Sequence, residues 1–333
     1  MQSYRSFYAI LLLLAAPFAL AQQETPSAPT VQTPASALTP GIGTLAAPPA
    51  ALFPPVDKAN FTADTPDTDT VNGFIHKLIG YDSKRVWQVQ AILKTQAEGV
   101  SKVVVLINEQ GKTAQDAQPL QFFTLPGGKF ALINDVTPFG KDPFGDARKT
   151  LLARATGPSR GAASKDLLLV EFADFQCPHC KDAQETIEKL LKDYPNAHFV
   201  YQNFPLVQIH SETFKATAYS ICVAKAGGDA KFFDFAKEVF ERQAGLTPDG
   251  SEITLKDAVV KVGLDPASIA ACAATPAVKA EIDAEIALAQ ELNVAGTPTL
   301  FVNGRGLSIA SIPYATLKQL IDFQIAEDGP APK

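Results

Sequence analysis

The stretch LLLVEFADFQCPHCKDAQETIEKLLKDYPNAHFVYQN, residues 167–203, carries the strongest pattern in this 333-residue sequence. Residues 167–172 are almost continuously apolar, which predicts a strand buried on both faces. Residues 178–193 have helical spacing, and residues 197–203 read as a second strand. A strand, a helix and a strand in this order predict a parallel βαβ unit with a right-handed crossover.

Two cysteines lie at the junction between the first strand and the helix, in the motif Cys177-Pro178-His179-Cys180. Cys177 is then expected at the start of the helix, where unpaired backbone N–H groups favour a thiolate. The spacing also lets the two sulfurs form a disulfide that opens and closes without large backbone movement. There are two alternative interpretations. The pair could be half of a zinc site that the two other cysteines of the chain complete, or it could be a purely structural disulfide.

Glu171 interrupts the apolar run of the first strand. A carboxyl in a strand that helices cover on both faces requires a reason, because burial disfavours its charge. The alternative is a glutamate exposed at a sheet edge, without a role. Asp174 and Lys181, on either side of the cysteine motif, are expected to be solvated neighbours.

The segment VEFADFQCPHC, residues 170–180, resembles the active-site stretch of the DsbA-like thioredoxin-fold family. The resemblance extends over roughly residues 160–326. It continues, in chain order, through Phe204-Pro205-Leu206, His210, Cys222, the stretch 232–243, Cys272 and GTPTLFVNG at residues 296–304. It implies an α/β thioredoxin fold with a helical insertion.

The resemblance also implies roles for residues outside the cysteine motif. Pro298 is expected to follow a cis peptide bond and to face the cysteine pair, with the backbone of Thr297 as an edge for an extended substrate segment. A trans proline at the start of an edge strand is the alternative. Glu171 is expected to accept the proton of Cys180 when a mixed disulfide resolves.

The first residues of the chain predict export. Arg5 precedes an apolar run over residues 9–16 and the small-residue exit Ala19-Leu20-Ala21, the pattern of a signal peptide over residues 1–21. A transmembrane anchor is the competing interpretation, although the run is shorter than the ~20 apolar residues that a span needs. No cysteine follows the run, so we expect a soluble mature protein that is periplasmic or otherwise exported, where disulfides form.

Cys222 and Cys272 fall in two separate stretches of the helical insertion. In an oxidising compartment their simplest fate is a disulfide with each other. The chain-entropy argument gives such a crosslink a stabilisation of ~4 kcal/mol. Two buried thiols are the alternative, since free cysteine packs well as a small apolar residue.

The rest of the chain divides by composition. Residues 22–57 are rich in Pro, Ala and Thr and contain no Lys or Arg, which predicts an extended linker. Residues 58–140 predict a small α+β domain, with a helix over 67–80 and an antiparallel meander of strands over 85–93, 103–107, 120–125 and 130–133. The remaining predicted parts are a connecting helix and Gly/Ser/Ala-rich break over 141–165, a catalytic domain over 166–326 and a tail over 327–333.

The resemblance implies dithiol–disulfide exchange on unfolded or thiol-containing exported proteins, without a metal or organic cofactor. An oxidase, reset by a membrane redox partner of the DsbB or VKOR type, is the primary interpretation. His179 is expected to stabilise the Cys177 thiolate further, which favours the oxidising direction. A surface histidine with no electrostatic role is the alternative.

Two other functions stay open. The small α+β domain faintly resembles, in architecture, the dimerisation domain of the DsbC/DsbG isomerases, which favours a homodimer acting as isomerase or reductase. A peptide-binding, chaperone-like module whose cysteines are only structural is a different class. The formal charge of −6, without a basic block, gives no sign of nucleic-acid binding.

Overall fold

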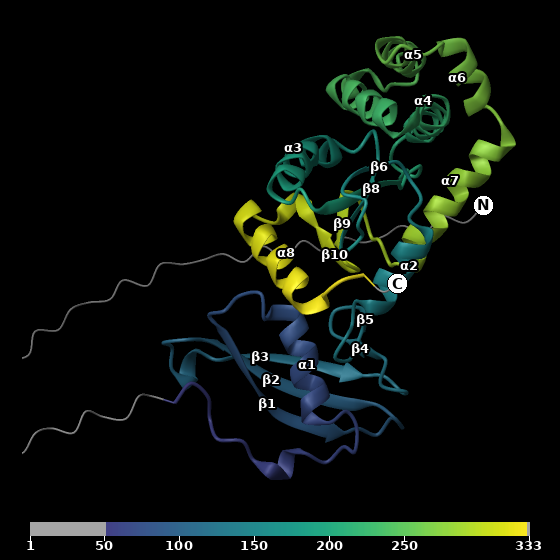
Figure 1. Ribbon diagram of the computed structural model, residues 1–333. Helices are drawn as coiled ribbons and strands as arrows, with labels where there is room; N and C mark the ends of the chain where they lie inside the picture. Colours follow the sequence, from purple (N-terminus) through teal and green to yellow (C-terminus); the bar gives the residue numbers. More distant parts are fainter. Residues whose placement is uncertain (1–50, 332–333) are drawn as a thin grey trace, which may run out of the picture. The chain divides into compact units, whose positions relative to one another are not determined.

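The computed structural model describes residues 51–331. The predicted signal peptide and most of the predicted linker lie outside the described residues. Two five-stranded sheets organise the described part of the chain (Figure 1).

The first sheet is an antiparallel meander in the strand order β1-β2-β3-β4-β5. Its strands are β1 (Arg85–Lys94), β2 (Ser101–Glu109), β3 (Gln118–Thr124), β4 (Phe130–Leu132) and β5 (Val136–Pro138). Helix α1 (Thr68–Ile79) lies across one face (Figure 1), and the carboxylate of Asp67 caps it by accepting a hydrogen bond from the backbone N–H of Thr70 at 2.7 Å. Val71, Phe74 and Ile75 bury the apolar side of α1 against the sheet.

Within residues 51–331, the opposite face of this sheet is exposed over β3, β4 and β5. Phe122 and Ala131 point toward α1 and are buried, so their neighbours along the strands point away. Phe123 pairs with Leu132 across β3 and β4, and Leu132 pairs with Val136 across β4 and β5. These three side chains are 40%, 41% and 49% exposed and form an apolar row across three strands.

The second sheet is mixed, with the order β10-β9-β7-β8-β6. Its strands are β6 (Ser159–Gly161), β7 (Leu167–Ala173), β8 (Ala197–Asn203), β9 (Thr299–Val302) and β10 (Arg305–Ser308). The central strand β7 runs parallel to β8 and antiparallel to β9.

Helices cover both faces of the second sheet. Leu167 and Leu169 of β7 join the core with α3 (Pro178–Asp193) and α8 (Tyr314–Asp328). Leu168, Val170 and Phe172 point to the other face, where they pack with α2 (Gly145–Arg154) and α7 (Pro276–Glu291). All residues of β7 are buried, as its apolar sequence predicts.

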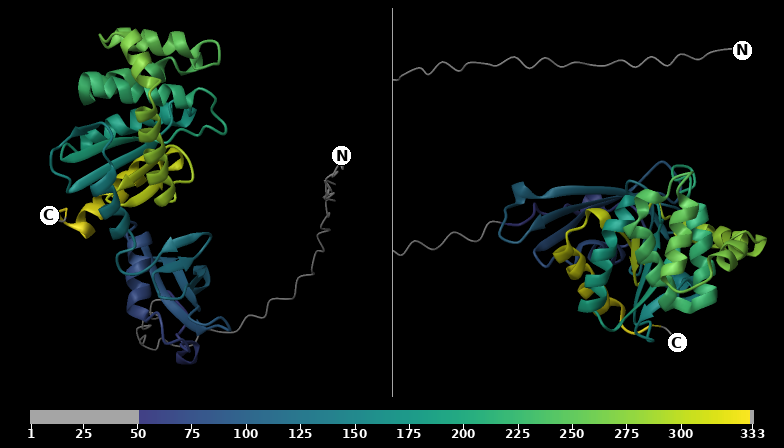
Figure 2. Two further views of the ribbon diagram at one scale, coloured as in Figure 1. Left: turned by 90° about the vertical axis from the view of Figure 1, so that its right-hand side faces the viewer. Right: turned by 90° about the horizontal axis from the view of Figure 1, so that it is seen from above.

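A helical insertion between β8 and β9 extends beyond one end of the second sheet, and its last helix returns along one face of the sheet (Figures 1 and 2). It contains α4 (Thr213–Glu241), α5 (Ser251–Lys261), α6 (Pro266–Ala273) and α7. Helix α4 is interrupted at Gly228, whose φ of 77° suits glycine. Cys222 of α4 and Cys272 of α6 form a disulfide with their Cα atoms 6.0 Å apart. None of the helices within residues 51–331 is long and apolar enough to cross a membrane.

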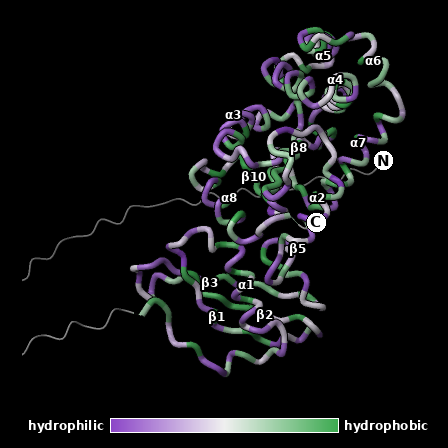
Figure 3. The backbone as a smooth tube through the Cα atoms, viewed as in Figure 1, coloured by the Kyte–Doolittle hydropathy of each residue, from purple (hydrophilic) through white to green (hydrophobic). Residues whose placement is uncertain are grey.

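The predicted fold class, a thioredoxin fold with a helical insertion preceded by a small α+β domain, is confirmed. The strands are rich in hydrophobic residues and the turns between them are hydrophilic (Figure 3). The short strands β5, β6 and β10 were not predicted, and β6 lies within the segment interpreted as a break. Short 3-10 turns complete the structure at Lys58–Asn60, Ala114–Asp116, Gln243–Gly245 and Ile309–Ser311.

Candidate active site

The cysteine motif lies where β7 ends and α3 begins. Cys177 is the N-cap residue of α3, and Pro178 takes the first helical position, where its missing N–H leaves no bond unmade. The backbone N–H of Cys180 donates to the carbonyl of Cys177 at 3.1 Å. Both cysteines are free thiols; Cys177 is 5% exposed and Cys180 is fully buried.

The two thiols have opposite proton affinities. A hydrogen bond from the Cys180 thiol, with smaller contributions that include the backbone N–H groups of Cys180 and His179, lowers the pKa of Cys177 to about 5. Burial raises the pKa of Cys180 far above its usual value, and the nearby charge of Glu171 adds to the effect. Cys177 is therefore the thiolate of the pair at neutral pH, and Cys180 keeps its proton.

His179 and Pro178 are exposed on the first turn of α3. The contact of His179 with the Cys177 sulfur is made by its backbone N–H. The predicted role of its imidazole stays a prediction.

The loop before β9 brings the second part of the site to the cysteines. The Thr297–Pro298 peptide bond is cis, not trans, and Pro298 is buried. In its thiol form, Cys177 Sγ donates to the carbonyl oxygen of Thr297 at 3.4 Å. The half-exposed Thr297 thus lies against the reactive sulfur, although 120 residues separate the two in sequence.

Glu171 lies under the cysteines, in the central strand rather than at an edge. Its side chain is fully buried, so the alternative of an edge-exposed glutamate is wrong. Burial raises the pKa of Glu171 to about 7, partly offset by a hydrogen bond that Oε1 accepts from Gln184 Nε2 at 3.3 Å. Within the described part of the chain, Oε2 has no hydrogen-bond partner. The carboxyl can therefore gain or lose a proton near neutral pH.

The expectation that Asp174 is solvated is wrong. Asp174 is fully buried, and its carboxylate accepts hydrogen bonds from four donors. These donors are the backbone N–H groups of Gln176 and Leu206, the His210 ring and the Thr213 hydroxyl. Lys181 is exposed, as expected.

Two glutamines that the sequence analysis did not single out hold the turn before α3. Gln243 Nε2 donates to the carbonyl oxygens of Phe175 and Cys177 at 2.8 and 2.9 Å. Gln176 Nε2 donates to the carbonyl of Leu246 at 2.8 Å. The sequence gives no sign of these bonds, because Gln243 and Leu246 belong to the insertion and reach the turn only in the folded chain.

The four cysteines form two separate pairs, since the disulfide joins Cys222 to Cys272. This pairing leaves neither of them for a zinc site with the Cys177–Cys180 pair. Across residues 51–331, no group of three or more His, Cys, Asp or Glu side chains is arranged to hold a metal ion.

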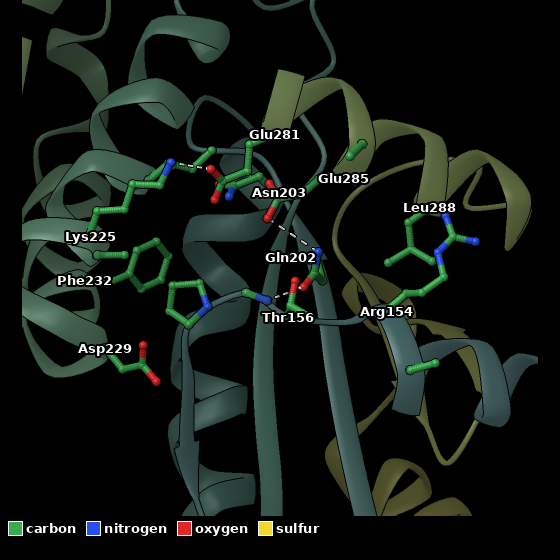
Figure 4. A pocket seen from close by; sticks show the side chains of 16 residues that line it. Arg154, Thr156, Gln202, Asn203, Lys225, Asp229, Phe232, Glu281, Glu285 and Leu288 are labelled. Atoms are coloured by element: carbon green, nitrogen blue, oxygen red, sulfur yellow. Dashed lines mark hydrogen bonds and ion pairs between the residues drawn. The ribbon is translucent and has the colours of Figure 1, made fainter. Parts of the chain in front are cut away.

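A separate cavity of about 520 Å³ lies at the carboxyl end of β8 (Figure 4). In its lining, Gln202 accepts a hydrogen bond from the N–H of Gly157, and Lys225 forms an ion pair with Glu281. Burial raises the pKa of Glu285, which also lines the cavity, to about 8. The cavity lining contains neither cysteine of the reactive pair.

The fold and the paired thiols define a thioredoxin-fold domain with a dithiol site. The model of the DSBA-like thioredoxin domain matches residues 168–322. The C-terminal half of the chain is thus a DsbA-like thioredoxin domain, of the kind found in thiol–disulfide oxidoreductases.

The chain is similar to several known proteins, and it covers a different share of the length of each. The chain is 29% identical over 146 residues to Na⁺/H⁺ antiporter NhaA 3 of Salinispora tropica, which is 44% of this chain but only 21% of that protein. It is 26% identical over 203 residues to the probable disulfide bond formation protein D of Bacillus cereus, covering 59% of this chain and 88% of that protein. A crystal structure of a thioredoxin-like oxidoreductase from Silicibacter pomeroyi DSS-3 is similar with a TM-score of 0.45 and 24% identity, over 53% of this chain and 95% of that one.

Proposed function

We propose that the protein is an exported oxidase that transfers the Cys177–Cys180 disulfide to pairs of thiols in other exported proteins. The observation that carries this proposal is the unequal pair of thiols, with the pKa of Cys177 lowered to about 5 and that of Cys180 raised. A stabilised Cys177 thiolate favours the reduced form of the pair, so the oxidised form gives up its disulfide readily.

The reaction proceeds in two exchanges. A substrate thiolate attacks Cys177 Sγ; the bond between Cys177 and Cys180 breaks, and Cys180 leaves as a thiolate that takes up a proton. A second substrate thiolate then attacks the substrate sulfur of the mixed disulfide, and Cys177 leaves as a thiolate. The substrate has lost two electrons, and the cysteine pair has gained them.

Glu171 is the proton partner of Cys180 in this scheme. With a pKa of about 7, its carboxyl is protonated in part of the molecules and can donate to the departing Cys180 thiolate. In the reverse direction the carboxylate accepts the Cys180 proton when the mixed disulfide resolves. Its burial favours direct transfer, because bulk water has little access to the fully buried Cys180.

Turnover requires that the reduced pair lose its electrons again. A membrane redox partner of the DsbB or VKOR type is the proposed acceptor. The N-terminal sequence pattern of a signal peptide supports an exported, periplasmic-type location, where such substrates and partners occur.

The direction of the reaction is tested by the reduction potential of the Cys177–Cys180 pair in glutathione buffers. We expect a potential above about −200 mV, on the oxidising side of the range for thioredoxin-fold enzymes. The second measurement is reoxidation of reduced, unfolded ribonuclease A by the oxidised protein, with Cys177→Ser as the inactive control. A potential near −270 mV would reassign the protein as a reductase.

A dimeric isomerase is the second candidate. The exposed apolar row of Phe123, Leu132 and Val136 favours it, because a second copy of the sheet could cover this face. Recovery of activity from scrambled ribonuclease, compared with Cys177→Ser, tests this function. A chaperone-like module is disfavoured by the free thiols and the lowered pKa of Cys177, which a purely structural pair does not need.

A further inference from the structure

Glu171 and Tyr201 lie side by side on neighbouring strands of the second sheet. They are partners in the parallel register of β7 and β8. Leu169 and Phe199, two positions before them, belong to the core on the α3 side of the sheet, and Tyr201 is part of the same core. Because side chains alternate between the two faces along a strand, Glu171 and Tyr201 both point toward α3.

Each of these two side chains has one polar atom without a partner. Among residues 51–331, neither Glu171 Oε2 nor the Tyr201 hydroxyl has a hydrogen-bond partner, and both side chains are buried. The carboxylate oxygen is an acceptor, and the hydroxyl can donate. A buried polar group without a hydrogen bond is costly, so an unpaired donor beside an unpaired acceptor needs an explanation.

The groups of α3 that face Glu171 are already engaged. Gln184 Nε2 donates to Glu171 Oε1 at 3.3 Å and to the carbonyl of Cys180 at 3.1 Å. The Cys180 thiol donates to the other cysteine of the pair. In β9, the register partner of Glu171 is a leucine, whose side chain offers no donor. These groups therefore leave Oε2 unbonded.

Arg160 is a second candidate donor, because its Nε also lacks a hydrogen-bond partner within the described residues. It belongs to β6, so that β8 lies between it and Glu171 in the sheet. Its guanidinium forms an ion pair with Glu188 at 2.7 Å and lies over the ring of Phe233, 4.5 Å from the ring centre. Arg160 thus acts on Glu171 through its charge, and Tyr201, on the adjacent strand, is the donor in register with it.

A cavity gives the two side chains room to meet. Its volume is about 570 Å³, and its lining includes Gln184 and Tyr201. The Tyr201 ring is packed against Phe175 and Phe232, with ring centres 5.7 and 5.1 Å away, so the ring is held in place. The terminal torsion of a glutamate is soft, so a small turn of the Glu171 carboxyl can bring Oε2 toward the hydroxyl.

We propose that Tyr201 is a positioning residue for the proton transfer at Glu171, and that its hydroxyl donates a hydrogen bond to Oε2 when the carboxyl has given its proton to Cys180. This inference rests on the proposed function, in which Glu171 and Cys180 exchange a proton. The hydroxyl keeps its own proton, because burial and the nearby charge of Glu171 raise the pKa of Tyr201 well above its ordinary value. A donor that does not ionise stabilises the carboxylate without competing for the proton.

Tyr201→Phe removes the hydroxyl and keeps the ring, so the variant should fold like the parent. A hydrogen bond to a charged group favours the ionised form, so its loss should raise the pKa of Glu171 by about one pH unit, which is about tenfold in the acid dissociation constant. Infrared difference spectra of the reduced protein between pH 5 and pH 9 follow the carbonyl band of the protonated carboxyl. The variant Glu171→Gln assigns that band.

The rate at which Cys180 resolves a mixed disulfide is the second measurement. With glutathione bonded to Cys177 Sγ, Cys180 passes its proton to Glu171, its thiolate attacks Cys177 Sγ, and glutathione leaves as a thiolate. The rate should rise with pH as Glu171 ionises, and in Tyr201→Phe the midpoint of this rise should move to higher pH by the same amount as the infrared midpoint. A packing defect alone would lower the rate at every pH and leave the midpoint in place, which would overturn the positioning role.

Tyr194→Phe is the matched control. Tyr194 is also a buried tyrosine, but its hydroxyl donates to Asp322 on α8 at 2.8 Å. Its removal should leave the Glu171 midpoint at the parent value. An unchanged midpoint in Tyr201→Phe would overturn the role of Tyr201 while leaving the proposed oxidase in place. A shifted midpoint together with a parent that transfers no disulfide would instead refute the oxidase and support the bond between Tyr201 and Glu171.

Discussion

The two sheets of the chain place their strands in different surroundings. Every residue of β7 is buried, because α3 and α8 cover one face of the second sheet and α2 and α7 cover the other. In β3 of the first sheet, buried residues alternate with half-exposed or exposed ones, because α1 covers only one face. A strand enclosed on both faces can hold a carboxyl away from water and so shift its pKa, as at Glu171. A strand with one exposed face can instead contribute to a surface that binds another molecule.

The largest effect is expected at Cys177, which lies between the enclosed strand β7 and helix α3. Cys177→Ser should abolish disulfide transfer, because serine forms neither the disulfide nor the mixed disulfide with substrate. Cys180→Ser, incubated with a disulfide-containing substrate, should instead accumulate a mixed disulfide, because the Cys177 thiolate attacks the substrate disulfide, one substrate sulfur leaves as a thiolate, and the resolving thiol is absent. Reoxidation of ribonuclease A and mass spectrometry of trapped adducts measure the two outcomes. Residual turnover in Cys177→Ser would place the chemistry elsewhere in the chain.

The difference in burial also predicts a difference in stability. Phe172→Ala should lower the free energy of unfolding by about 3–5 kcal/mol, because it leaves a cavity beside Phe301, with which the ring packs edge to face. Phe123→Ala, at the open face, should cost less than about 1 kcal/mol. Urea unfolding, at a concentration where light scattering finds one species, measures both. Equal losses would mean that the open face is buried in solution.

Glu171→Gln should change how stability depends on pH. The folded-state pKa of Glu171, about 7, lies above the ordinary value of 4.5, so only the unfolded chain releases this proton between those values. The contribution of Glu171 to stability is therefore unaffected below pH 4.5 and falls by roughly 3 kcal/mol as pH rises to 7 and above. Glutamine does not titrate, so the Glu171→Gln variant does not lose this stability as pH rises.

The pH effect is measured by urea unfolding of parent and Glu171→Gln at pH 5 and pH 8. Relative to the parent, the variant should gain stability at pH 8. The same variant should exchange disulfides more slowly with an altered pH profile, since glutamine cannot pass a proton to Cys180. A parallel pH dependence of stability in both proteins would mean that the Glu171 carboxyl is not desolvated.

The open face predicts self-association. If a second copy covers Phe123, Leu132 and Val136, then Leu132→Lys should weaken the dimer at least tenfold, because a lysine would be buried without a partner. Light scattering and sedimentation of parent and variant measure the dissociation. A parent that is monomeric at micromolar concentration contradicts the dimer.

The smallest effect is expected at His179. His179→Val keeps the backbone N–H that reaches the Cys177 sulfur, so only the imidazole contribution is lost. The pKa of Cys177 should move upward by roughly half a pH unit, and the reduction potential of the pair should fall accordingly. Thiolate absorbance in the ultraviolet, followed against pH, measures it. Equal titration curves would assign the whole effect to the helix N-terminus and Cys180.

The sequence predicts well those elements whose signal is local. The bounds of α3 and β8 follow from helical spacing and from an apolar run, and the structure has them at the predicted residues. Strands β5, β6 and β10 have only three or four residues each and exist because a neighbouring strand pairs with each of them. Such strands leave no period of their own in the sequence.

The candidate active site, like the fold, is predictable from the sequence only where the signal is local. The cysteine motif from Cys177 to Cys180 is recognisable in the sequence by its spacing, directly after an apolar strand. Glu171 is recognisable because it is a charged residue within that strand. The prediction that Asp174 is solvated is wrong because its carboxylate accepts hydrogen bonds from residues 206, 210 and 213. These donors reach it only when the chain beyond β8 has folded. A carboxylate beside a reactive motif looks solvated until those partners are known.

The disulfide between Cys222 and Cys272 has a consequence for proteolysis. Cys177 precedes the crosslinked loop and Pro298 follows it, so the two sides of the active site come from segments on either side of the helical insertion. A protease that cuts once within residues 243–250 produces two fragments, one carrying each side. Because Cys222 and Cys272 lie on opposite sides of the cut, their disulfide keeps the two fragments in one covalent molecule. The fragments separate on a gel only after reduction.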